Sequence, residues 1–140
     1  MSRSGYTDDE GDDPLQYGRW RGRIKSAIRG ARGQQFLRDA LAALDAMPEK
    51  RLIVEELLDD EKEVCTLGAV LIAKGADPSQ FDPHDHDGLG KALNIAPCLV
   101  QEIEFENDDE WAPTTPEQRW QRMRRYIEKL IKPQKADATQ

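Results

Sequence analysis

Apolar residues recur every three or four positions along most of this 140-residue chain, and this spacing constrains its fold more than any other feature. The clearest example is segment 34–47, which ends before Pro48 and repeats the apolar positions Phe36, Leu37, Ala40, Leu41, Leu44 and Met47. Such a period is typical of an amphipathic helix, and proline ends one. The segment therefore predicts a helix packed on a core.

The same spacing predicts further helices, over residues 15–30, 67–74, 88–93, 95–107 and 116–131. Gly30 and Gly33 are expected to break the chain between the first two helices, and Asp87 to cap the helix at 88–93. Before the last helix, Thr115 begins a capping box with Gln118, and Pro116 occupies the first helical position.

Residues 51–66 are ambiguous, because a short apolar run fits either period. One interpretation is a short β-hairpin near 52–66, with a polar turn at 59–62. The alternative is a helix over 49–58. The fold class predicted is mainly α (α+β): a compact bundle of about five to six helices, with the hairpin left open.

The chain length fits a single domain. Residues 1–13 are acidic and lack an apolar pattern, so we expect disorder there, followed by a helical domain at 14–132 and a flexible tail at 133–140. No apolar run is long enough to span a bilayer, and the polar N-terminus does not resemble a signal peptide. We therefore expect a cytoplasmic protein without a membrane partner, and the sequence leaves its oligomeric state open.

Charge is segregated along the chain, whose net charge is −7. Residues 14–38 carry seven Lys or Arg and no acidic residue, whereas residues 39–63 sum to −6, residues 64–111 to −8 and residues 112–140 to +4. The basic ends either pair with the acidic middle or face a partner, and both alternatives stay open.

The cationic candidates for a binding face occupy the first and last helices. They are Arg19, Arg21, Lys25, Arg29 and Arg32, with Arg122, Arg125 and Lys129. These side chains could neutralise phosphates, and Tyr17 or Trp20 could stack on bases. A net-acidic chain is nevertheless unusual for a nucleic-acid binder, which is generally basic overall.

An acidic run before the last helix offers a second candidate face. It contains Glu102, Glu106, Asp108 and Asp109. Such a run could grip a basic partner or imitate a phosphate backbone, although charge runs are more often solvated helix faces.

The side chains most able to take part in catalysis or to bind a metal are those of Cys65, His84 and His86. The two histidines lie in an Asp-rich loop, where two ligands give a weak metal signal and the carboxylate spacing does not match an EF-hand. Cys65 sits among small apolar residues, as a buried cysteine does. We predict no metal, cofactor or catalytic residue, and keep a small enzyme using Cys65 or the His84/His86 loop as an alternative.

Several short motifs resemble a family of small uncharacterised proteins found in phages, prophages and bacterial genomes. The similar stretches are Arg19-Trp20-Arg21-Gly22, Arg32-Gly33-Gln34 with Phe36-Leu37, Ala43-Leu44-Asp45-Ala46-Met47-Pro48, Val64-Cys65 with Leu67-Gly68-Ala69, Glu102-Ile103 with Glu106-Asn107-Asp108, and the Trp-containing final helix. The resemblance covers most of residues 15–131. It implies a phage or prophage setting, in which small acidic proteins often inhibit host defence, and it transfers no activity.

These observations favour a non-catalytic binding protein with segregated charged surfaces. Its most concrete form is a phage-type inhibitor that binds a protein or ribonucleoprotein complex of bacterial defence. The alternative to this function is direct nucleic-acid binding through the basic helices at 19–32 and 119–132.

Overall fold

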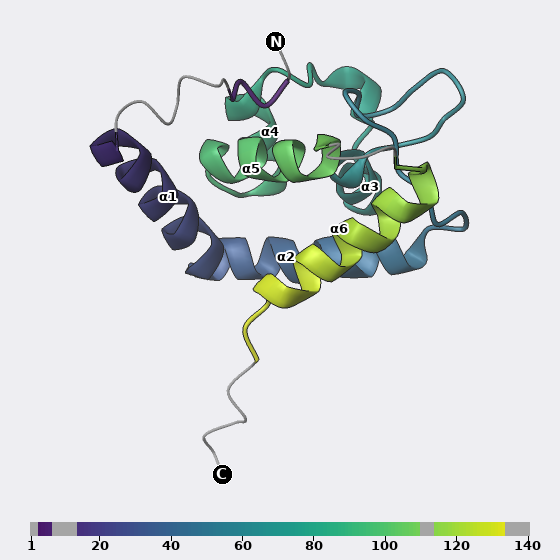
Figure 1. The fold of residues 1–140 in the computed structure, drawn as a ribbon. Helices are drawn as coiled ribbons and strands as arrows, with labels where there is room; N and C mark the ends of the chain where they lie inside the picture. The colour runs from purple at the N-terminus through teal and green to yellow at the C-terminus, as the bar shows by residue number, and fades with distance from the viewer. Residues whose placement is uncertain (1–2, 7–13, 110–113, 134–140) are drawn as a thin grey trace.

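The computed structural model describes residues 3–6, 14–109 and 114–133, and it is mainly helical (Figure 1). The elements are α1 (Pro14–Arg29), α2 (Ala31–Ala46), α3 (Thr66–Ala73), the 3-10 turn η2 (Pro78–Gln80), α4 (His86–Leu93), α5 (Pro97–Asp108) and α6 (Pro116–Leu130). This confirms the predicted helical bundle. None of the described helices is both long and apolar enough to cross a membrane.

The core forms where α2 meets α3 and α6. In Figure 1, α6 crosses α2 diagonally, with α5 between them and α4. Apolar side chains from these helices are fully enclosed, including Phe36, Leu37, Leu44, Leu71, Leu99, Ile103, Met123 and Ile127. The indole nitrogen of Trp120 donates a 3.1 Å hydrogen bond to the Leu44 carbonyl and so ties α6 to α2. Burial of these stripes provides most of the stabilisation of such helices.

Helices α1 and α2 meet in a sharp corner at Gly30 (Figure 1). The expectation that Gly33 also breaks the chain is wrong, because Gly33 lies buried inside α2. A Cβ atom at Gly33 would come within 1.8 Å of the Ala27 carbonyl oxygen. Glycine is required at this position because it lets the backbone of α2 approach that of α1.

The predicted helix ends are largely correct. Thr115 and Gln118 form the complete capping box of α6, with Pro116 in its first turn. The cap of α4 is Asp85 rather than Asp87, because the Asp85 carboxylate reaches the Gly88 N–H at 3.0 Å and α4 already begins at His86. The helix therefore starts two residues earlier than expected.

Residues 47–65 form neither a helix nor a hairpin with strands. The alternative helix over 49–58 is wrong, and the hairpin reduces to one antiparallel bridge between Leu58 and Val64. Contacts with α6 explain this difference, since the Leu52 N–H donates to the Pro116 carbonyl and Arg119 donates to the Leu52 carbonyl. Partners from elsewhere thus satisfy backbone groups that a helix would pair locally.

Residues 3–6 belong to the stretch predicted to be disordered, yet they pack against α4 and α5, where Arg3 and Ser4 are buried. The remainder of that stretch, residues 1–2 and 7–13, lies outside the described residues, as do residues 110–113. Most of the predicted tail, residues 134–140, also lies outside them.

Candidate functional site

Arg3 anchors the N-terminal segment in a buried polar cluster. Its guanidinium donates two hydrogen bonds to the Asp108 carboxylate, 2.7 Å and 2.8 Å long, and a third of 3.5 Å to the Cys65 sulfur. The Arg3 side chain has no exposed surface, and that of Asp108 retains only 8%. A two-pronged contact of this kind is among the strongest pairings that arginine makes.

His86 joins the same cluster from the start of α4. Its Nε2 atom lies 2.8 Å from the Arg3 carbonyl oxygen and 2.9 Å from Oε1 of Glu104. A carbonyl only accepts hydrogen bonds, so this nitrogen carries the proton. Oε2 of Glu104 has no hydrogen-bond partner among the described residues, and burial raises the pKa of this carboxyl to about 8.

The candidate catalytic or metal-binding side chains therefore lie in two separate places. Cys65 and His86 both contact Arg3, while His84 is exposed and pairs with Asp82. The Cys65 thiol is buried and also accepts the Gly68 N–H as the cap of α3. Among the described residues, no three His, Cys, Asp or Glu side chains are grouped to hold a metal ion.

Much of the acidic candidate face is turned toward the protein itself. Glu102 is buried and accepts hydrogen bonds from the Tyr6 hydroxyl at 2.8 Å and from Arg21 at 3.0 Å. Glu106 is half-buried, and burial raises its pKa. Asp109, also half-buried, follows Asp108 at the end of α5. These four carboxylates therefore do not form one solvated face.

The basic candidates fall into two groups. Arg21 and Arg122 serve the fold: Arg21 pairs with Glu102, and Arg122 donates to the last carbonyls of α5, those of Glu106 and Asn107. The others are exposed, namely Arg19, Lys25, Arg29, Arg32, Arg125 and Lys129. The basic ends thus lie partly against the acidic middle and partly toward solvent.

The exposed cations of α1 continue to the start of α2 and the end of α6. The Lys132 ammonium donates a 3.0 Å hydrogen bond to the Arg29 carbonyl, so the ends of α1 and α6 meet. Arg23 is exposed on the same helix and was absent from the sequence-derived set. We call Arg19, Arg23, Lys25, Arg29 and Arg32 the α1 cationic surface.

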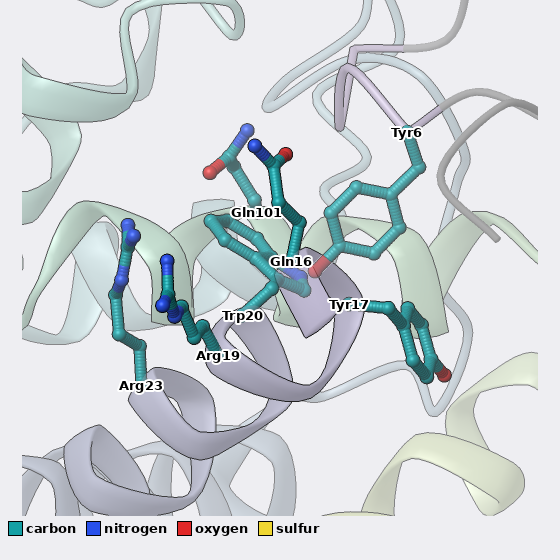
Figure 2. A pocket seen from close by; sticks show the side chains of 7 residues that line it. All are labelled: Tyr6, Gln16, Tyr17, Arg19, Trp20, Arg23 and Gln101. Carbon is teal, nitrogen blue, oxygen red and sulfur yellow. The ribbon is translucent and has the colours of Figure 1, made fainter. Parts of the chain in front are cut away.

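A pocket of about 390 Å³ opens beside the first half of α1. It is lined by Tyr6, Gln16, Tyr17, Arg19, Trp20, Arg23 and Gln101. Figure 2 shows Arg19 and Arg23 on one side of Trp20, with Tyr6 and Tyr17 on the other. The Tyr6 and Trp20 rings meet edge to face with centroids 5.8 Å apart, and the Tyr17 side chain is 49% exposed.

The sequence indicated only part of this pocket. Arg19, Tyr17 and Trp20 were among the predicted candidates, whereas Arg23 and Gln16 of the same helix were not. Tyr6 and Gln101 were missed, because they reach α1 from the N-terminal segment and from α5. No local pattern relates these two residues to Trp20, and only the tertiary fold brings them together.

No protein-family model matches this chain, and comparison with curated proteins and with solved structures gives no significant match. The resemblance to phage and prophage proteins therefore stays a prediction.

Proposed function

We propose that this chain is a non-catalytic binding protein that contacts an anionic partner through the α1 cationic surface. One observation carries the proposal. All five cations of this surface are exposed, and none makes an ion pair with a described residue. By contrast, Arg3, Arg21, Arg51, Lys74 and Arg124 all pair with carboxylates.

The overall charge makes this arrangement directional. The chain carries a net charge of −7, so an anionic partner is repelled by most of the molecule and attracted at the α1 cationic surface. Such complementarity selects the docking orientation and speeds association more than it adds affinity. Charge segregation of this kind supports a specific anionic partner.

The partner that we propose is a protein or ribonucleoprotein complex in the cytoplasm of a bacterial host. The corresponding biological form is a phage or prophage inhibitor of bacterial defence. The family resemblance supports that form, and the charge arrangement supports the binding face.

A non-catalytic role is supported by the state of the reactive side chains. The Cys65 thiol is buried against Arg3, and burial raises the pKa of the half-exposed Cys98 thiol. Reactive cysteines instead have lowered pKa values at accessible positions. The His86 Nε2 atom donates to Glu104 and Arg3, so its proton is held inside the buried cluster.

The test compares two double variants with the same change in net charge. Arg23→Glu/Arg29→Glu reverses the α1 cationic surface, while Lys62→Glu/Lys91→Glu reverses two exposed lysines elsewhere. Tagged proteins are incubated with lysates of candidate hosts, and the bound material is quantified by mass spectrometry. We expect the lysine variant to retain the partner of the wild-type chain and the arginine variant to lose it.

Circular dichroism melts of both variants provide the folding control. Retention of the same partner by a folded Arg23→Glu/Arg29→Glu protein would falsify the proposed binding face. Equal loss from both variants would attribute the effect to net charge alone and would also contradict the proposal.

A further inference from the structure

We infer that the pocket beside α1 accepts an unpaired nucleobase, so that the anionic partner is, or contains, single-stranded nucleic acid. This inference rests on the proposed function and names the chemical class of its partner. The observation behind it is the composition of the pocket, which combines aromatic rings, arginines and amides in one hollow (Figure 2).

The aromatic rings provide a stacking platform. Tyr17 is half exposed at the pocket, and the Trp20 ring is partly exposed while Tyr6 supports it edge to face. Tyr6 is itself fixed, since its hydroxyl donates to buried Glu102 and its ring packs against Phe105 with centroids 5.0 Å apart. A preformed aromatic surface stacks with any base, because every base has a π-face.

The arginines stand where a phosphate beside the base would lie. Arg19 and Arg23 are one helical turn apart and both line the pocket. Lys25 and Arg29 are exposed farther along α1, away from the pocket, and Arg32 is exposed in the first turn of α2. Aromatic rings flanked by cations are the arrangement by which proteins hold single strands.

The pocket volume and its amide groups fit the same ligand. About 390 Å³ lies within the range of pockets that enclose small organic ligands. Gln101 lines the hollow with an amide that can pair with the edge of a base, and it is held in place by a 2.9 Å hydrogen bond to the Ser4 carbonyl.

Duplex nucleic acid fits these observations less well. In a duplex both faces of every base are already stacked, so the rings of the pocket would stay unused. Proteins that bind duplexes rely on many phosphate contacts, whereas the α1 cationic surface supplies only five cations. A single strand bound at one pocket needs only the few cations beside it.

The experiment measures binding by fluorescence anisotropy at low salt. The probes are a labelled oligothymidylate about 12 nucleotides long, an abasic oligonucleotide of the same length and the corresponding duplex. We expect the oligothymidylate to bind about tenfold more tightly than the abasic strand, because only the former can stack.

Tyr17→Ala is the decisive variant, with Leu15→Ala as its control on the same exposed turn of α1. We expect Tyr17→Ala to weaken binding of the oligothymidylate about tenfold and to leave binding of the abasic strand unchanged. Leu15→Ala should change neither affinity, and Arg23→Ala should weaken both.

Three outcomes separate this inference from the function on which it rests. Equal binding of the thymidylate and abasic strands would overturn base recognition while leaving an anion-binding surface. If no oligonucleotide binds but the host partner is still retained through α1, the inference is wrong and the partner is an acidic protein. Failure of both experiments overturns the proposed function as well.

Discussion

Arg3 and Arg23 show two opposite uses of the same side chain. Arg3 is fully buried and donates hydrogen bonds to Asp108 and Cys65, whereas Arg23 is exposed beside the α1 pocket. Arg3 links the N-terminal segment to the C-terminal end of α5 and to the N-cap of α3. Arg23 is available to a partner. Burial and neighbouring carboxylates, rather than residue type, therefore decide which charges serve the fold.

The most severe test of this contrast is Arg3→Ala. The change leaves the Asp108 carboxylate buried without its cationic partner, and losing one member of a buried pair costs about 3–5 kcal/mol. Chemical denaturation should show this loss in the free energy of unfolding. Arg23→Ala, the control, should stay within about 0.5 kcal/mol of the wild-type value. Equal effects of the two variants would remove the distinction between the regions.

A second test uses pH to probe the buried cluster alone. The pKa of Glu104 is raised from 4.5 to about 8 in the folded protein, so the folded state holds a proton that the unfolded state releases between these values. Stability from this group is complete below about pH 4.5 and declines as pH rises toward about 8, by at most about 1.4 kcal/mol per pH unit.

Glu104→Gln removes this titration and keeps an oxygen that can accept from His86. The difference in unfolding free energy between wild type and variant should therefore shift against the wild type from about pH 5 to about pH 8, by up to about 4 kcal/mol. Because the other titrating groups are common to both proteins, the difference isolates Glu104. Parallel stability curves would contradict a raised pKa.

Added salt should weaken binding at the α1 cationic surface and leave the stability of the buried Arg3 cluster nearly unchanged. If about four phosphates contact the α1 cationic surface, a roughly fourfold increase in salt lowers affinity for a single strand about 50-fold. The buried Arg3–Asp108 pair is shielded from ions, so the melting temperature should change little. Anisotropy titrations and melts at the same salt concentrations check this, and an affinity independent of salt would exclude phosphate contacts.

Arg21 is intermediate between the buried Arg3 and the exposed Arg23, and its loss should have an effect between theirs. It pairs with buried Glu102 but keeps 36% of its own surface exposed, and Tyr6 also donates to that carboxylate. We expect Arg21→Ala to cost about 1 kcal/mol of unfolding free energy, since solvent screens the pair and one donor is retained. Chemical denaturation measures this change in unfolding free energy. A loss as large as that of Arg3→Ala would show that Arg21 stabilises the fold as strongly as a fully buried arginine.

The sequence predicted the helices well because their signals are local. The apolar stripe of α2 stops before Pro48, and the capping box of α6 lies within four residues. Residues 49–58 lacked such signals. The backbone of this segment is hydrogen-bonded at Leu52 to Pro116 and Arg119. Tertiary contacts therefore determine a conformation that periodicity left ambiguous.

The buried cluster was less predictable than the cationic surface. Exposed charges on α1 follow from helical spacing alone, and most of that set could be read from the chain. The burial of Arg3 depends on Asp108, which is 105 residues away, and Tyr6 reaches Glu102 across 96 residues. A polar, acidic segment resembles a disordered one until its distant partners are in place.

The same separation imposes an order on the synthesis and folding of this chain. Arg3 leaves the ribosome long before Asp108 exists, so the N-terminal segment has to wait until α5 is made. Contacts between residues this distant in sequence carry a large cost in loop-closure entropy, and they form after local helices. Tyr6, which supports one wall of the pocket, arrives with the same segment. A nascent or truncated chain can therefore already contain α1 and α2 and still lack a complete pocket.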